Sequence, residues 1–112
     1  MSMILTVNDH NGIPVVELAG KVKGEGDKHL QTCLEELLKG PAKKVVVDLS
    51  KAEYIDSHGL GVIIYYHKML SADKRALIVL NADSKADSYM ARLIEITNLD
   101  KVHTVASSLE GL

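Results

Sequence analysis

The segment 45–68, VVVDLSKAEYIDSHGLGVIIYYHK, constrains the fold more than any other part of the chain. It opens with three consecutive valines, and a run that is apolar at successive positions is typical of a central strand buried on both faces. A polar stretch follows, after which Asp56 and Ser57 precede an apolar sequence that contains two glycines. We therefore expect a strand over 44–49, a loop, and a helix over 57–71.

The residues at the start of the chain predict a hairpin. Strands are expected at 4–7 and 13–18, joined by turn residues at 8–12 that tolerate left-handed backbone conformations. Pro14 indicates that the second strand begins at a sheet edge or outside the ladder, because proline has no N–H to donate.

A helix is expected after the glycine-rich loop at 20–26. Asp27 can cap its N-terminus, and Gly40 and Pro41 can end it, since glycine accepts a left-handed conformation and proline cannot continue a helix. Its apolar positions recur at helical spacing and are Leu30, Cys33, Leu34, Leu37 and Leu38.

The remainder of the chain continues the alternation of strands and helices. A strand at 76–80 is apolar like the one at 44–49, so the two are expected to lie parallel, joined through the helix between them. A further helix is expected at 86–97 and a last short strand at 102–105. We predict one α/β domain over 1–112, a sandwich with a mixed sheet of about five strands and three to four helices, in the order β-β-α-β-α-β-α-β.

The bulk composition argues against several classes of function. Of the 112 residues, 46% are apolar and 25% are charged, as in an ordinary globular domain. The net charge of −2, with no block of lysine or arginine, argues against a nucleic-acid partner. No apolar run is long enough for membrane insertion. The N-terminus lacks the features of a secretory signal, and a single cysteine, Cys33, excludes an internal disulfide, so a cytoplasmic location is expected.

The helix at 57–71 presents unusual side chains on its outward face. At about 100° per residue, one side should face the core and contains Gly59, Leu60, Ile63, Ile64, His67 and Leu70. The opposite side contains Ser57, Gly61, Tyr65 and Lys68, with His58, Val62 and Met69 along its margin. Because valine, tyrosine and methionine are uncommon on a helix face that meets only water, we predict that this stripe contacts a partner.

Ser57 allows two interpretations. A serine or aspartate at the start of a helix can simply be an N-cap, which stabilises the helix by roughly 1 kcal/mol. The free N–H groups and the dipole of a helix N-terminus also favour a phosphate, so Ser57 is a candidate for phosphorylation as well. Gly61, one turn further on the same face, would leave the hydroxyl open to another protein's active site. The two interpretations are compatible with each other.

The motif DLSKAEYIDSHGLGVI resembles the central motif of STAS domains (sulfate transporter and anti-sigma factor antagonist), in particular that of stand-alone bacterial anti-sigma factor antagonists. In that family a strand ends in Asp-Leu-Ser, and Asp-Ser-Ser/Thr-Gly-Leu-Gly opens a helix. The length of the chain and the order of its elements also match. The resemblance therefore covers nearly the whole chain and implies a STAS-like fold.

The resemblance implies a phosphorylation switch, with no catalytic residues and no cofactor in the chain itself. Ser57 corresponds to the family's phosphoacceptor. The unmodified protein would bind an anti-sigma factor with serine kinase activity and thereby free its sigma factor. Phosphorylation would break that complex, and a phosphatase would reset it. The residues expected at the partner surface are Asp56, His58, Gly61, Val62, Tyr65, Lys68 and Lys23.

The chain departs from the family pattern at two places. His58 stands where a serine or threonine is usual, either without consequence or as an imidazole that makes phosphate affinity depend on pH. Lys21 and Lys23 stand where family members often have carboxylates, near the partner surface. These departures keep a second function open, that of a non-catalytic STAS subunit docked permanently on an ABC-type transporter ATPase.

Other chemistry is disfavoured by the spacing of the residues. Asp56, Ser57 and His58 are the residue types of a hydrolase triad, but neighbours on a helix point about 100° apart and cannot form the required relay. The five histidines lack the paired spacing of a metal site, and no glycine cluster matches a nucleotide-binding fingerprint. We therefore expect neither a metal nor a cofactor.

Overall fold

Strands and helices alternate along the chain as the sequence predicts. The computed structural model describes residues 3–80 and 104–106. In chain order the elements are β1 (Met3–His10), β2 (Ile13–Val22), α1 (Glu25–Lys39), β3 (Lys44–Ile55), α2 (Ser57–Ala72), β4 (Ala76–Leu80) and β5 (Thr104–Ala106). The strands form one sheet in the order β1-β2-β3-β4-β5, in which β1 is antiparallel to β2 and the other neighbours are parallel. The predicted α/β fold with a mixed sheet is confirmed.

Two predicted elements lie at or beyond the limits of the described residues. The helix expected at 86–97 lies outside them. The last strand, expected at 102–105, is found as β5 and pairs in parallel with β4.

The β1–β2 hairpin closes through a two-residue turn at Asn11 and Gly12. Their φ angles are positive, 52° and 86°, as hairpin turns of this length require. Pro14 pairs with Asp9 of β1, whereas the ladder between β2 and β3 begins only at Val15. Pro14 therefore lies outside the β2–β3 ladder, as predicted, although it is part of the hairpin ladder with β1.

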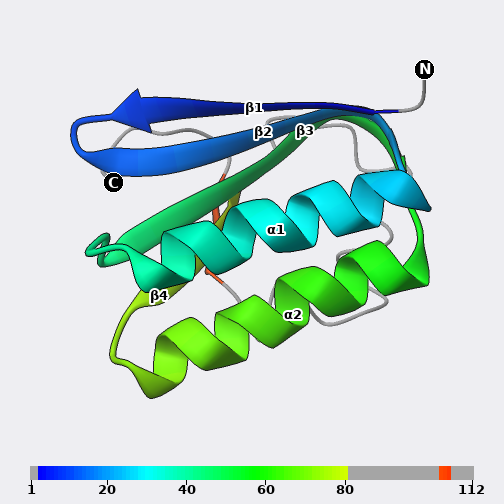
Figure 1. The fold of residues 1–112 in the computed structure, drawn as a ribbon. Helices are drawn as coiled ribbons and strands as arrows, with labels where there is room; N and C mark the ends of the chain where they lie inside the picture. Colours follow the sequence, from blue (N-terminus) through cyan, green and yellow to red (C-terminus); the bar gives the residue numbers. More distant parts are fainter. Residues whose placement is uncertain (1–2, 81–103, 107–112) are drawn as a thin grey trace.

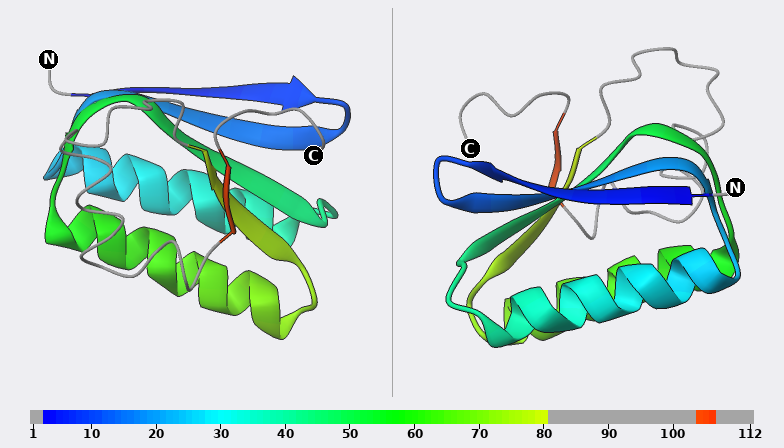
Figure 2. Two further views of the ribbon diagram at one scale, coloured as in Figure 1. Left: turned by 180° about the vertical axis from the view of Figure 1, so that it is seen from behind. Right: turned by 45° about the horizontal axis from the view of Figure 1, so that its top comes forward.

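Both helices cover the same face of the sheet and lie side by side there (Figures 1 and 2). Their N-termini lie at one end of the molecule, and the hairpin turn lies at the other (Figure 1). The main core fills the space between helices and sheet, with buried members that include Val16, Leu18, Leu30, Leu34, Leu49, Ile63 and Val79. Val45 and Val47 belong to this core, whereas Val46 belongs to a cluster on the opposite face, so β3 is buried on both faces as its valines predict.

The segment 50–55 is strand and not the loop that its polar residues predict. It forms the second half of β3, because β2 also runs further than expected and provides backbone partners for it. Lys21 pairs with Tyr54 and Val22 with Ile55, after two irregularities in the register. Pairing between strands that are distant in sequence therefore outweighs the local preference for a loop.

The ends of α1 differ from the sequence prediction in two ways. The helix begins at Glu25 after Gly24, which has a φ of 57° and makes no side-chain cap hydrogen bond. Asp27, the predicted cap, instead lies in the first turn and is buried. At the other end α1 stops before Gly40 as predicted, but Gly40 is extended (φ −83°, ψ −179°) and not left-handed. The terminal carbonyl groups are bound instead by the side chain of Arg75.

Candidate functional site

Asp56 caps the N-terminus of α2. Its backbone is extended (φ −83°, ψ 173°), and its Oδ1 accepts a hydrogen bond from the N–H of Gly59 at 2.7 Å. Of the two cap candidates, Asp56 is therefore the N-cap, and Ser57 is the first residue of the helix. Ser57 is exposed, and its side chain has no hydrogen-bond partner in the part of the chain that the structure describes.

A second carboxylate, that of Asp27 on α1, lies against the start of α2. Asp27 is 1% exposed, and its Oδ2 lies 3.1 Å from Nδ1 of His58. Burial raises the pKa of Asp27 above its ordinary value and the adjacent Asp56 adds to this rise, whereas His58 acts in the opposite direction. The sequence predicts Asp27 only as a helix cap, because no local pattern pairs it with a residue 31 positions away.

The two glycines of α2 have different surroundings. A Cβ on Gly59 would lie 2.8 Å from Oδ1 of Asp27 and 2.9 Å from Cγ1 of Ile55, so only glycine fits here. A Cβ on Gly61 would meet no atom of the described residues within 4 Å. Gly59 therefore permits the close approach of α1, β3 and α2, and Gly61 leaves open space beside the outward face, as the sequence predicts.

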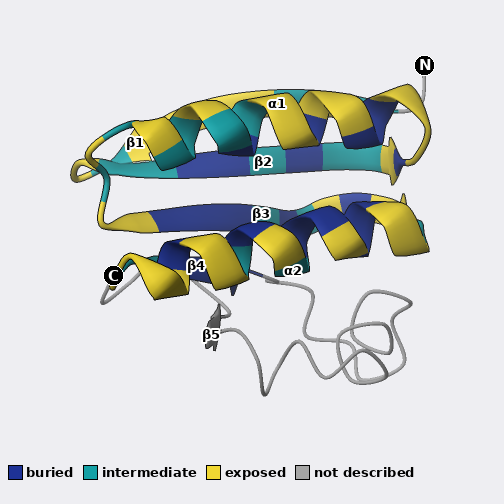
Figure 3. Cartoon of the chain, turned by 60° about the horizontal axis from the view of Figure 1, so that its bottom comes forward, coloured by how far each residue is buried: buried dark blue, intermediate teal, exposed yellow. Residues whose placement is uncertain are grey.

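Most of the predicted outward stripe of α2 is exposed. Tyr65 is 54% exposed and Met69 41%, and the exposed set also includes Ser57, His58, Gly61 and Lys68. Val62 is the exception, because it is only 7% exposed and belongs to the core. The expectation that Val62 is exposed is wrong, because it packs into the same core cluster as Leu30 and Leu34 of α1, the helix that lies beside α2 (Figure 3).

A hollow of about 320 Å³ opens between α1 and α2, next to this surface. It is lined by Gln31, Glu35, His58, Gly61, Val62, Tyr65 and Tyr66. The hydroxyl of Tyr66 donates a hydrogen bond to Oε1 of Glu35 at 2.8 Å, and burial together with Glu35 raises the pKa of Tyr66 to about 12. The rings of Tyr65 and Tyr66 meet edge to face, with centroids 5.0 Å apart. The sequence does not predict Gln31 or Glu35 as site residues, because they reach the site only through the packing of α1.

Lys23 lies at the same end of the molecule as Ser57. It follows β2 directly, and the carbonyl oxygen of the preceding residue, Val22, accepts a hydrogen bond from the N–H of Asp56 at 3.1 Å. Lys23 is exposed. The structure therefore brings this predicted residue near the start of α2, whereas Lys68 is exposed further along the same helix.

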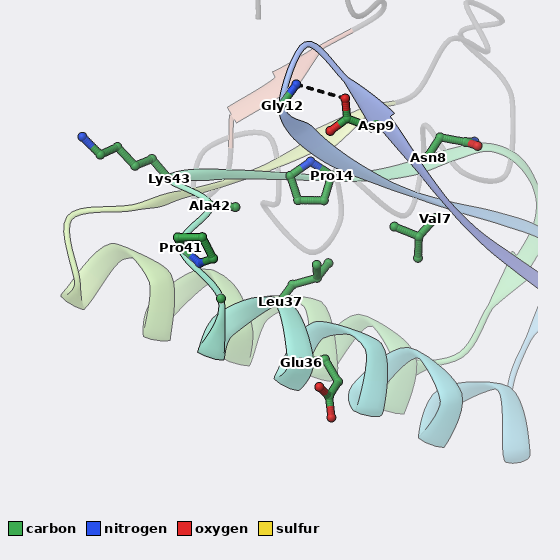
Figure 4. A pocket seen from close by; sticks show the side chains of 11 residues that line it. Val7, Asn8, Asp9, Gly12, Pro14, Glu36, Leu37, Pro41, Ala42 and Lys43 are labelled. Atoms are coloured by element: carbon green, nitrogen blue, oxygen red, sulfur yellow. Dashed lines mark hydrogen bonds between the residues drawn. The ribbon is translucent and has the colours of Figure 1, made fainter.

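A larger hollow, of about 600 Å³, lies between the hairpin turn and the C-terminus of α1 (Figure 4). Its lining includes Val7, Pro14 and Leu37, and a carboxylate oxygen of Asp9 accepts a hydrogen bond from the N–H of Gly12 at 3.1 Å. Because it lies at the opposite end of the helices from Ser57, it has no part in the candidate site.

The described residues show no metal centre and no reactive thiol. Among them, no three or more His, Cys, Asp or Glu side chains are arranged to hold a metal ion. Cys33 is half-buried, and burial raises the pKa of its thiol, which disfavours the reactive thiolate. Neither α1 nor α2 combines the length and the apolar character that a membrane-crossing helix needs.

Known proteins resemble this chain along nearly its whole length. The family model of the STAS domain matches residues 5–111. The anti-sigma-F factor antagonist RsfB of Mycobacterium tuberculosis is 26% identical over 108 residues, which cover 96% of this chain and 84% of RsfB.

Solved structures share the fold. An anti-sigma factor antagonist from Mycobacterium paratuberculosis superposes with a TM-score of 0.83 at 24% identity, over 97% of this chain and 89% of that one. The anti-sigma factor antagonist SpoIIAA in its unphosphorylated form gives a TM-score of 0.77 at 15% identity, over 96% and 91% of the two chains. The phosphorylated form of SpoIIAA, from Bacillus, gives 0.73 at 16% identity, over 96% and 95%.

Proposed function

The chain belongs to the STAS domain family, and we propose that it is an anti-sigma factor antagonist controlled by phosphorylation of Ser57. One observation supports this assignment above all. Ser57 is the exposed first residue of α2, directly after the N-cap Asp56 and one turn before the open position at Gly61. A kinase can therefore reach Ser57, and a partner can lie flat against the helix around it.

The position of Ser57 explains how a phosphate would act. The N–H groups and the dipole of the first turn of α2 favour an anion, so the phosphorylated chain stays folded. The phosphate adds a charge of about −1.5 to −2 directly after the carboxylate of Asp56, the N-cap of α2. A partner that removes water from this patch would have to bury that charge, so the complex dissociates.

The proposed partner surface consists of the exposed residues around this serine. They are His58, Gly61, Tyr65, Lys68 and Lys23, together with the half-buried Asp56. In this proposal the partner is an anti-sigma factor with serine kinase activity, a phosphatase reverses the modification, and the protein acts in the cytoplasm as a regulator and not as an enzyme.

Phosphate transfer from the cognate anti-sigma kinase tests the site. Incubated with the kinase and Mg-ATP, the protein should gain the mass of one phosphate, and Ser57→Ala should gain none. Ser71→Ala, an exposed serine at the other end of α2, serves as the matched control and should be modified like the unaltered protein. Undiminished phosphorylation of Ser57→Ala would show that the site is elsewhere.

Binding of the Ser57→Asp variant separates the switch from permanent docking. If the protein is a switch, the added carboxylate should weaken the complex with the anti-sigma factor. Recovery of an ABC-type transporter ATPase in a pull-down, with binding unaffected by Ser57→Asp, would instead support the transporter-subunit function.

A further inference from the structure

The hollow between α1 and α2 contains a carboxylate that forms no ion pair with any described residue. Glu35 is half-buried there and accepts the hydrogen bond of the Tyr66 hydroxyl at 2.8 Å. No described lysine or arginine lies within ion-pair distance of Glu35, and the nearby Lys28 lies 3.8 Å from Glu25 instead. A negative charge that is partly removed from water is stabilised by a cation, which the described part of the chain does not supply at this position.

The aromatic rings of Tyr65 and Tyr66 line the same hollow as this carboxylate. Tyr65 is 54% exposed, and its ring meets that of Tyr66 edge to face at an interplanar angle of 86°. This contact fixes the orientation of the two rings relative to each other. Gly61, one turn before Tyr65, has no side chain beside the ring, and no described residue lies within 4 Å of its Cβ position. The ring of Tyr65 is therefore accessible from the solvent.

A guanidinium group matches this combination better than other ligands. It is a planar cation that can pair with a carboxylate through two N–H donors and can stack on an aromatic ring. An anion would be repelled by Glu35, and an apolar group would leave the carboxylate without a partner. The volume of about 320 Å³ lies at the lower end of the range of about 300–1,000 Å³ for ligand sites, so it fits a side chain and not a large cofactor.

We propose that this hollow receives an arginine side chain of the protein that docks on the Ser57 face. The arginine pairs with Glu35 and stacks on Tyr65. His58 directly follows Ser57 on α2, and Gly61 lies one turn further. Both line the hollow, so the arginine and the phosphorylation site belong to one interface. This inference rests on the proposed function and adds the chemistry of the partner.

A titration with a small arginine compound tests the hollow without the partner. N-acetyl-arginine methylamide is added to the ¹⁵N-labelled protein, and amide chemical shifts are followed by NMR. We expect saturable shifts at Gly61, Tyr65 and Glu35. The citrulline analogue has the same shape without the charge and should produce no saturable shift. Equal shifts with both compounds, or no saturable shift with arginine, would overturn the proposal.

Two variants locate the binding. Glu35→Gln should weaken arginine binding about tenfold, which corresponds to about 1.4 kcal/mol. Glu36→Gln removes the same charge from the next residue of α1, which is exposed and lines the distant hollow, and should leave binding unchanged. Equal effects of the two substitutions would contradict a specific site at Glu35. Thermal unfolding of both variants shows whether the fold is retained.

The outcome of this titration is independent of the phosphorylation assay. The arginine compound needs neither the kinase nor the hydroxyl of Ser57. A failed titration therefore contradicts the arginine site but not the phosphorylation switch. Phosphorylation at another residue would contradict the assignment of Ser57 but not the arginine site.

Discussion

At the scale of single residues, the two glycines of α2 lie half a turn apart but serve different purposes. Gly59 lies where α1, β3 and α2 meet, with Asp27 and Ile55 closer to its Cβ position than any side chain could tolerate. Gly61 faces open space. A glycine inside a helix lowers stability by about 0.5–1 kcal/mol relative to alanine, and no contact with the described residues requires a glycine at position 61.

Alanine substitutions at these positions should have opposite effects on stability. Gly59→Ala should destabilise the protein by about 1–3 kcal/mol, because the added methyl group overpacks the junction. Gly61→Ala should stabilise it by about 0.5–1 kcal/mol, because the methyl group meets no neighbour. Equilibrium unfolding in urea measures both changes, and a shift of the same sign in both variants would contradict the different roles of the glycines.

Asp27 should make the stability of the protein depend on pH. In the folded state the pKa of its carboxyl is raised, mainly by burial and additionally by the neighbouring Asp56. The folded state therefore holds this proton more firmly than the unfolded state, in which the pKa is about 3.9. The stabilising contribution of the protonated group is fully present below that value and is lost as the pH rises through the higher pKa of the folded state.

The variant Asp27→Asn should lack this dependence. As the pH rises from about 4 to 7, the unaltered protein should lose stability relative to Asp27→Asn, because only the former must bury a charge. Urea unfolding of both proteins across this range measures the difference. His58→Gln should steepen the loss, since it removes the group that opposes the rise in the pKa of Asp27. Parallel pH profiles for all three proteins would show that Asp27 does not titrate in this way.

At the scale of elements, the C-terminus of α1 is held by a residue from beyond α2. Arg75 precedes β4, and its guanidinium donates hydrogen bonds at 2.7–3.1 Å to the carbonyl oxygens of Leu37, Leu38, Gly40 and Ala42. Leu37 and Leu38 lie in the last turn of α1, where carbonyl groups have no N–H partner within the helix, and Gly40 and Ala42 follow the helix. The hydrogen bonds of one side chain therefore connect the C-terminus of α1 to the residue that precedes β4.

Loss of the guanidinium should destabilise the protein substantially. Arg75→Met retains much of the apolar stem but removes the guanidinium donor from four carbonyl groups at the end of α1 and just after it, and we expect a loss of about 2–3 kcal/mol. Asp73→Asn is the matched control, because it removes only the ion pair at 3.5 Å between Arg75 and Asp73, whose side chain is exposed, and should change stability by less than about 1 kcal/mol. Urea unfolding compares the two variants, and similar small effects would mean that Arg75 does not hold the helix end.

At the scale of the whole molecule, stability depends on the layer between the two helices and the sheet. Ile63 of α2 is completely buried in that layer, whereas Met69 of the same helix is 41% exposed. The helices expose their outer surfaces along their whole length (Figure 3). One helix therefore serves both the core and the candidate partner surface.

Truncation of Ile63 and of Met69 should separate these two roles. Ile63→Ala leaves a cavity in the main core and should lower the free energy of unfolding by about 2–5 kcal/mol. Met69→Ala removes an exposed side chain of similar size and should change it by about 0.5 kcal/mol or less. Equilibrium unfolding followed by circular dichroism measures both, and equal losses would contradict the layered core.

Local rules were sufficient to predict much of the fold and the start of the candidate site. The valines of β3 indicate a doubly buried strand, and the period of α2 places Ile63 inside and Tyr65 outside. The Asp-Ser pair indicates a capped helix that begins with an exposed serine. Each of these features depends on residues within one strand or one helical turn, so the sequence by itself determined them.

Contacts between distant elements could not be predicted in this way. Val62 is buried, Asp27 reaches His58 and Glu35 reaches Tyr66 because α1 lies beside α2, and both hydrogen bonds join residues 31 positions apart. The polar second half of β3 is strand because β2 extends to pair with it. Helical period and residue type describe one element at a time, whereas these contacts depend on which elements pack together, and only the tertiary structure decided that.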